Sequence, residues 1–233
     1  MKFAMWKVTL LCLAGVALLG APPAELTNAR DHQDLAALNS LISQYQQASQ
    51  AKPQCNECLY KVALADSFAA EVAMEVRDKR KSQSFAEAGM DAAQKLTAGN
   101  GNNAEYHRLL GELCGQVIPA NPLLGALKYG QCAKDEIDKA IQLDPKLGLA
   151  YVSRGVGNYY LPSSMGGGID VALKDFDQAL AIDPKLAEAY LWKGITLRKA
   201  NRNSDARQAF EKALELNPQR LWAKQQLEKT PAT

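Results

Sequence analysis

Apolar residues recur every three or four positions along most of this chain, beginning near residue 25. That spacing places them on one face of a helix. A strand would need a run of alternating apolar and polar residues, and no convincing run of that kind follows residue 25. Two of these faces are Ala172, Phe176, Ala179 and Leu180, and Ala206, Phe210, Ala213 and Leu214. The pattern predicts an all-α protein.

Three similar tripeptides mark the ends of the expected helices. They are Leu143-Asp144-Pro145, Ile182-Asp183-Pro184 and Leu216-Asn217-Pro218. Because proline disfavours the helical conformation of the residue before it, each tripeptide ends one helix. We expect the same Asp or Asn to cap the next helix, with proline at its first position. Pro184 and Pro218 lie 34 positions apart, and a self-match at this spacing is typical of a repeated helix pair.

The last two copies of this repeat share a recognisable set of residues. From Ala187 to Arg220 they are Tyr190, Gly194, Leu197, Ala206, Phe210, Ala213 and Pro218, with Lys193 where leucine is usual. In the copy before they are Tyr151, Gly155, Ala172, Phe176, Ala179 and Pro184. The pattern resembles the tetratricopeptide repeat, strongly over 145–220 and more weakly over 54–144. The resemblance implies an α-solenoid of antiparallel helix pairs, whose stacked repeats present a surface for partners.

The upstream copies are less regular. Gly111 and Ala140 keep the small positions, and Ile137 replaces the aromatic residue. The segments 129–133 and 139–145 resemble the regulator of microtubule dynamics proteins, which are similarly irregular solenoids. That resemblance implies architecture alone, because we do not expect microtubule binding in a chain with a bacterial-looking export signal.

The first 24 residues have the layout of that signal. Lys2 and Lys7 precede the uncharged apolar run Val8–Leu19, which is short for a membrane span. We therefore expect a periplasmic or secreted protein, or alternatively one anchored in the membrane by an uncleaved segment. The rest divides into divergent N-terminal helices over 25–100 and a repeat domain over 101–233. We expect an opening helix near Asn28–Ala51 and a polar capping helix over 219–229.

Charge and histidine content exclude several classes of function. The 27 basic residues include Lys2 and Lys7, so 25 basic residues face 25 acidic ones beyond the signal. This balance leaves no basic footprint for nucleic acid. Of the two histidines, we expect His107 in the core and His32 exposed, and we expect no metal, cofactor or catalytic site.

Four cysteines follow the signal, and they permit three disulfide connectivities. Proximity favours the pairs Cys55–Cys58 and Cys114–Cys132. The first pair has the spacing of a redox motif, but the βαβ context of such motifs is missing. A structural disulfide is the favoured interpretation, and a thiol-redox protein using Cys55 and Cys58 remains an alternative.

The repeat register also predicts a binding groove. We expect the first helix of each pair to line the inner face of the solenoid with Val152, Val156, Tyr159, Tyr160, Leu191, Ile195 and Arg198. Relatives that bind chaperone tails carry Lys and Asn at such positions, so that activity is not expected here. An apolar groove with a charged margin suits an extended or helical segment of a protein or peptide partner, unless the N-terminal helices cover it.

These observations favour a non-catalytic interaction or scaffold module of the cell envelope. The other alternative is a small-molecule-binding auxiliary protein of an uptake system, which would have a closed cavity beside Tyr159 and Tyr160. Finally, we expect Gly155 and Gly194 to let the first helix of their repeats approach Ala172 and Ala206 of the second helix.

Overall fold

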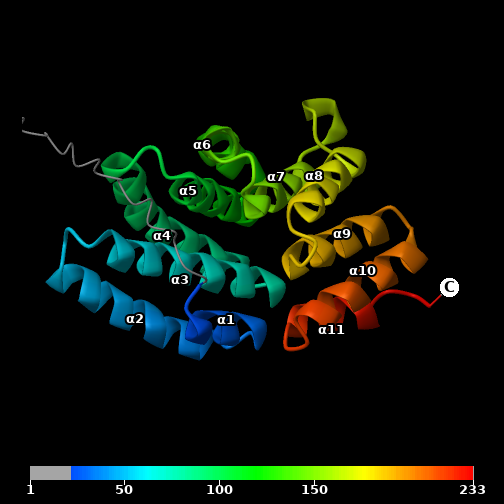
Figure 1. Cartoon of the computed structure of the whole chain (residues 1–233), viewed down its shortest axis with the longest axis horizontal. Helices are drawn as coiled ribbons and strands as arrows, with labels where there is room; N and C mark the ends of the chain where they lie inside the picture. Colours follow the sequence, from blue (N-terminus) through cyan, green and yellow to red (C-terminus); the bar gives the residue numbers. More distant parts are fainter. Residues whose placement is uncertain (1–21, 233) are drawn as a thin grey trace, which may run out of the picture.

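The computed structural model describes residues 22–232 and consists there of eleven α-helices and two short 3-10 helices, with no strand (Figure 1). The α-helices are α1 (Ala24–Asp31), α2 (Leu35–Ala51), α3 (Asn56–Glu75), α4 (Lys79–Gly99), α5 (Ala104–Val117), α6 (Pro122–Leu143), α7 (Gly148–Tyr160), α8 (Ile169–Ile182), α9 (Ala187–Lys199), α10 (Asn203–Leu216) and α11 (Leu221–Glu228). The 3-10 helices are η1 (Ile118–Ala120) and η2 (Ser163–Met165). The all-α class is therefore confirmed. Most of the predicted signal segment lies outside the described residues, although Ala24 begins α1.

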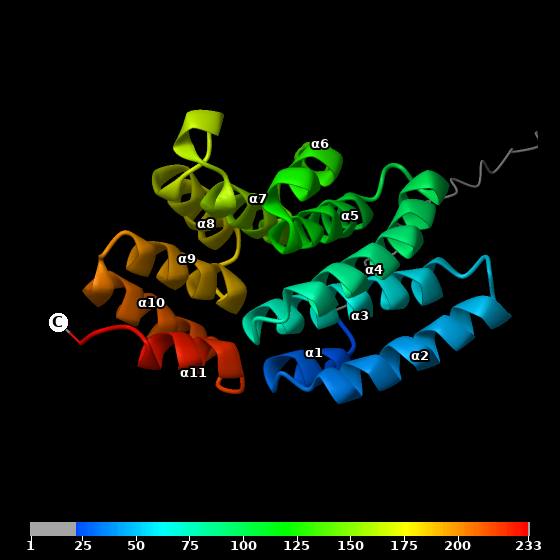
Figure 2. The same ribbon diagram turned by 180° about the vertical axis from the view of Figure 1, so that it is seen from behind.

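Successive helices pair and stack in the manner of an α-solenoid. The pairs α3–α4, α5–α6, α7–α8 and α9–α10 follow one another, and α11 covers the last of them (Figures 1 and 2). The row of pairs curves back on itself, so that the end of α1 lies beside the start of α11 in both views. The predicted solenoid is confirmed, and its two ends meet. Among the described helices, none is both long enough and apolar enough to cross a membrane.

The opening helix is two helices and not one. Gln33 takes a positive φ of 56°, and Asp34 accepts a hydrogen bond from the Ala37 amide as the N-cap of α2. A short aspartate before an apolar run is a helix start signal, and it breaks the single helix expected over Asn28–Ala51. Because of the break, α1 takes a different direction from α2 and packs against α3, with its end toward α11.

The Asx-Pro junctions end helices as predicted, but they do not cap the following ones. The side chains of Asp144, Asp183 and Asn217 accept hydrogen bonds from the amides two residues later, at 2.9–3.2 Å. Each forms a turn of its own before the next helix starts. The residues at the N-cap positions of α7, α9 and α11 are Leu147, Leu186 and Arg220.

The atoms nearest to the small residues of the last two repeats belong to aromatic rings, and not to the alanines that we expected. A Cβ on Gly155 would lie 2.6 Å from the Phe176 ring, and a Cβ on Gly194 would lie 2.6 Å from the Phe210 ring. Gly111 has the same relation to Ile137, at 2.8 Å. In each pair the large residue of the second helix occupies the space that a side chain on the glycine would fill. The glycine therefore determines how closely the two helices pack.

The core consists of three hydrophobic clusters. One large cluster extends through α1–α5 and is flanked by residues of α6. Two smaller clusters lie in α7–α11, one centred on Phe176 and the other on Phe210. We call α1–α6 the N-terminal half and α7–α11 the C-terminal half.

Candidate functional site

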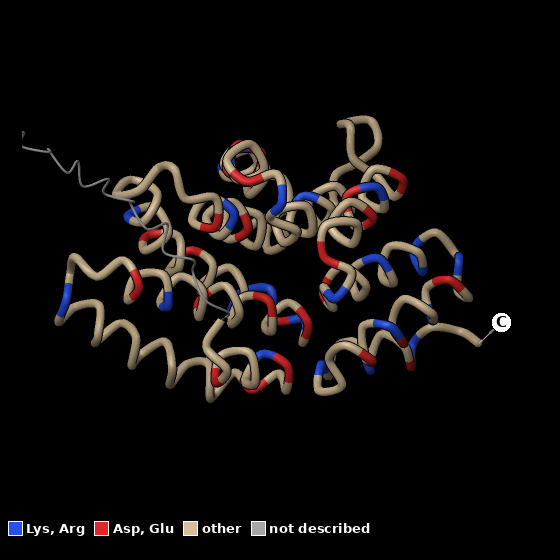
Figure 3. Tube along the Cα trace, in the orientation of Figure 1, with Lys and Arg blue, Asp and Glu red and all other residues tan. Residues whose placement is uncertain are grey.

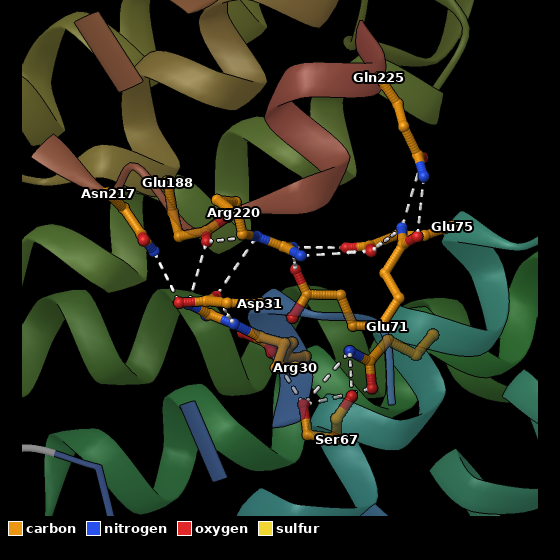
Figure 4. A network of polar contacts seen from close by, with 12 residues as sticks. Arg30, Asp31, Ser67, Glu71, Glu75, Glu188, Asn217, Arg220 and Gln225 are labelled. Carbon is orange, nitrogen blue, oxygen red and sulfur yellow. Dashed lines mark hydrogen bonds and ion pairs between the residues drawn. The ribbon is translucent and has the colours of Figure 1, made fainter. Parts of the chain in front are cut away.

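The ends of the solenoid are joined by polar side chains around one buried arginine. Arg220 stands at the turn between α10 and α11 and is 1% exposed. Figure 3 shows acidic and basic positions gathered where α1 and α3 end near the start of α11, while α2 carries no charge. Figure 4 shows the same place from close by.

The Arg220 guanidinium binds carboxylates from both halves of the molecule. Nη2 donates to Glu71 of α3 at 2.6 Å, and the same group also bonds Glu75 in a short contact. Nε donates to Glu188 of α9 at 3.1 Å and lies 3.8 Å from Asp31 of α1. One side chain at the start of α11 therefore contacts three helices, α1, α3 and α9, that are far apart in the sequence.

A second arginine and two amides complete the arrangement (Figure 4). Arg30 binds Asp31 at 2.8 Å and Glu188 at 3.3 Å, and it lies over the Phe68 ring. Asn217 donates to Asp31 at 2.8 Å, and Gln33 donates to Glu75 at 2.7 Å. We call this set the Arg220 cluster; it consists of Arg30, Asp31, Gln33, Glu71, Glu75, Glu188, Asn217 and Arg220.

The Arg220 cluster holds more acids than bases. Four carboxyl groups face two guanidinium groups in a place where little water enters. Burial raises the pKa of Glu71 to about 8, although Arg220 opposes the shift. Burial also raises the pKa of Glu75. For Glu188 burial acts in the same direction, but Arg220 and Arg30 together lower its pKa. The raised pKa values of Glu71 and Glu75 favour protonation of the excess acid, which reduces the repulsion among the carboxylates.

The inner face of the N-terminal half is occupied by a second set of internal contacts. Arg108 of α5 is 5% exposed and bonds Glu105 at 2.6 Å as well as Glu112. Tyr60 and Ser67 of α3 donate to these two glutamates at 3.0 and 2.9 Å. The polar groups of this face satisfy one another, so few remain for a partner.

The inner face of the C-terminal half carries four aromatic rings that contact one another, which we call the aromatic cluster. They are Tyr159 and Tyr160 at the end of α7, Trp192 of α9 and Trp222 of α11. Neighbouring ring centroids lie 4.9–6.3 Å apart with the planes tilted by 64–85°. Tyr160 is 56% exposed. Edge-to-face arrangements of this kind are a preferred geometry of packed aromatic rings.

The structure divides the predicted groove residues into two groups. Val152, Leu191 and Ile195 are 6%, 1% and 6% exposed and belong to the hydrophobic clusters. Val156, Tyr159, Tyr160 and Arg198 retain exposed surface. The N-terminal helices reach this half through the Arg220 cluster, where Arg30 of α1 binds Glu188 of α9.

The structure contains both disulfides that proximity favours, Cys55–Cys58 and Cys114–Cys132. Cys55 is the N-cap of α3, and Cys114 joins α5 to α6. His32 is exposed, and His107 is 8% exposed. His107 makes hydrogen bonds with Glu136 and the Gly101 carbonyl, so its buried position is polar and not an apolar packing site. Within residues 22–232, no group of His, Cys, Asp and Glu side chains is arranged to hold a metal ion.

The sequence does contain a signal for Arg220 that our interpretation missed. The positions after Pro145-Lys146 and Pro184-Lys185 are Leu147 and Leu186, and the matching position after Pro218-Gln219 is Arg220. A charged residue at a leucine position of a repeat indicates a special environment. Trp222 was missed because its segment was interpreted only as a polar cap.

The helix pairs and the glycine–aromatic contacts define a solenoid of tetratricopeptide type. A family model described as "Tetratricopeptide repeat" matches residues 187–220. A second family model, "Regulator of microtubule dynamics protein 1-3", matches residues 25–163, which is more than half of the chain. The chain belongs to that family.

Individual relatives are more distant. Regulator of microtubule dynamics protein 3 of Bos taurus is 31% identical over 97 residues, which are 42% of this chain and 20% of the relative. The chain therefore spans about a fifth of the length of this curated relative. A thermophilic tetratricopeptide protein of Thermus thermophilus has a TM-score of 0.62 at 19% identity, with 89% of this chain and 98% of that chain covered. The HusA haemophore from Porphyromonas gingivalis has a TM-score of 0.51 at 17% identity, with 86% and 96% covered. These two likenesses show the fold.

Proposed function

We propose that this chain is a non-catalytic module of the cell envelope that binds a protein partner on the inner face of its C-terminal half. The observation that carries the proposal is the contrast between the two inner faces. The N-terminal face is occupied by the Arg108 and Glu112 contacts, whereas the C-terminal face presents the aromatic cluster. Tyrosine and tryptophan are the residues that most often dominate binding energy at interfaces.

The cellular location is also part of the proposal. The basic start and the apolar run Val8–Leu19 support export to the periplasm or beyond, with an uncleaved membrane anchor as the alternative. Fractionation of cells expressing the full chain, followed by sequencing of its N-terminus, tests this. A chain recovered with cytosolic markers and an intact N-terminus would reject the export signal.

Affinity capture tests the binding function. The tagged chain would be incubated with an envelope extract, and the retained proteins identified by mass spectrometry. We expect a specific partner that Tyr160→Ala loses and that Val171→Ala, an exposed residue of the outer helix α8, retains. Because Tyr160 is 56% exposed, its truncation should leave the fold intact. Retention of the same partner by Tyr160→Ala would remove the aromatic cluster from the binding surface.

A thiol-redox function has one observation in its favour. Cys55 is the N-cap of the 20-residue helix α3, and the Cys58 amide donates to its sulfur at 3.1 Å. Helix N-termini stabilise thiolates, as redox motifs require. Equilibration with glutathione buffers tests this alternative. A Cys55–Cys58 disulfide that stays oxidised in strongly reducing buffer is structural, and one that exchanges readily supports redox activity.

A further inference from the structure

The polar atoms of the aromatic cluster have no partners within the chain. Among the described residues, neither indole N–H of Trp192 and Trp222 and neither hydroxyl of Tyr159 and Tyr160 forms a hydrogen bond, while their rings pack against one another. None of these atoms is both buried and without a hydrogen-bond partner, so water reaches them. A tyrosine or tryptophan with an apolar body packed in place and a free polar tip is suited to contact a second molecule.

Two cations beside the cluster are also without an acidic partner. Arg198 donates to the backbone carbonyl and side-chain oxygen of Gln226, at 3.2 and 2.5 Å. Lys199 donates to the Tyr159 carbonyl at 3.0 Å and lies 4.1 Å from the centre of the Tyr159 ring. Within residues 22–232 neither forms an ion pair, whereas Lys193 of the same helix binds Asp177. Two positive charges next to the rings are thus available to a negatively charged ligand.

Together these groups form a surface with more hydrogen-bond donors than acceptors. The indole N–H groups, the guanidinium and the ammonium can only donate, whereas the phenol hydroxyls can both donate and accept. The complementary ligand is rich in acceptors and poor in donors. Among polypeptides, this describes an extended segment with prolines, whose carbonyls point outward and whose proline nitrogens carry no hydrogen. Proline rings also pack well between tilted aromatic rings.

We propose that the partner segment bound at the aromatic cluster is an acidic, proline-containing peptide in an extended conformation. Its prolines pack on Tyr160, Tyr159, Trp192 and Trp222, its carbonyls accept from the indole and phenol groups, and its carboxylates face Arg198 and Lys199. This inference rests on the proposed function, since it names the chemistry of the partner that the module binds.

Titration with synthetic peptides tests this chemistry. The full chain carrying Trp6→Phe would be used, because Trp192 and Trp222 are then its two tryptophans. The probes are a peptide of alternating glutamate and proline, the same peptide with lysine for glutamate, and the same peptide with alanine for proline. We expect the first peptide to change the tryptophan fluorescence saturably and to bind more weakly at high salt, as screened charges require. The other two should bind at least about tenfold more weakly.

Variants separate the ring from its hydroxyl and from the charge. Tyr160→Ala should weaken binding about tenfold, Tyr160→Phe by a smaller factor, and Lys199→Ala should reduce the salt dependence. Val171→Ala on α8 should change nothing. Equal binding of the alanine or lysine peptide would overturn the proposal.

The failure of this inference is distinguishable from the failure of the proposed function. If Tyr160→Ala loses its captured partner and no acidic proline peptide binds, the module still binds a partner but the acidic, proline-containing chemistry of that partner is wrong. Saturable binding of a small planar anion such as haem, without binding of any peptide, would also overturn it.

Discussion

The two halves of the molecule reach the same architecture by different means. The C-terminal half follows the repeat closely, with Gly155 under Phe176 and Gly194 under Phe210. The N-terminal half departs from the repeat and carries both disulfides and the buried acid Asp66. The difference indicates that regular repeats are held by local packing. The irregular half adds the covalent constraints of the two disulfides, and Arg220 is the place where the two halves are tied together.

Replacing Arg220 tests whether this residue holds the two halves together. Of the changes considered, it should lower the free energy of unfolding the most. Arg220→Met leaves Glu71, Glu75, Glu188 and Asp31 buried with Arg30 as their nearby cation, and breaking a buried ion pair in this way costs roughly 3–5 kcal/mol. Urea unfolding at pH 7 measures the loss, and small-angle X-ray scattering should show a larger radius of gyration as the ends of the solenoid separate.

A matched control is available in Arg202→Met. Arg202 pairs with Asp205 on the surface at 56% and 46% exposure, and pairs of this kind contribute about 1 kcal/mol or less. Equal losses for the two variants would mean that the Arg220 cluster does not hold the halves together.

The buried Asp66 of the N-terminal half should make the stability of the protein depend on pH. It lies in α3 at 1% exposure, its Oδ2 has no hydrogen-bond partner, and burial raises its pKa to about 7. The folded state therefore binds a proton that the unfolded chain releases near pH 4, and the stability present below pH 4 is lost as pH rises through 7. The shift corresponds to at most about 4 kcal/mol.

Asp66→Asn removes the buried charge, so the variant should gain stability over the wild type at about pH 8 and match it near pH 4. Thermal unfolding across this range measures the difference. Asp91→Asn is the control, because Asp91 is an exposed acid of the neighbouring helix α4. An equal gain in both variants would indicate a change in net charge and not the burial of Asp66.

How far the sequence could predict the molecule depends on the range of the interactions involved. The helix pairs could be placed because glycine, phenylalanine and Asx-Pro recur at short, fixed spacing. The burial of Arg220 could not be predicted, because it requires the two ends of the solenoid to meet. No local sequence pattern indicates how strongly the solenoid curves. The same limit applies to Val152, Leu191 and Ile195. Their register placed them on the inner helices, but whether neighbours cover them depends on how tightly the repeats stack.

We expect the Cys114–Cys132 disulfide to stabilise only the N-terminal half against unfolding. It closes a loop of 18 residues between α5 and α6, for which chain entropy gives about 3 kcal/mol, against about 2 kcal/mol for the short loop of Cys55–Cys58. Reduction of a Cys55→Ser/Cys58→Ser variant should lower the protection of α5 and α6 amides from hydrogen exchange and leave α9 and α10 unchanged. Equal loss of protection in α9 and α10 would show that the halves unfold as one unit.

The smallest effect concerns the packing of the C-terminal half. Gly194→Ala places a Cβ 2.6 Å from the Phe210 ring, and overpacking of this kind costs roughly 1–3 kcal/mol, since the ring is fully buried and has little room to shift. Gly157→Ala is the matched change in α7, where an added Cβ meets nothing within 4 Å, and helix propensity should there stabilise the protein by about 0.5–1 kcal/mol. Melting temperatures that move in opposite directions for the two alanines would confirm that the glycine–phenylalanine contact holds the regular repeats. A Gly194→Ala variant as stable as Gly157→Ala would show that this half tolerates looser packing than its sequence pattern implies.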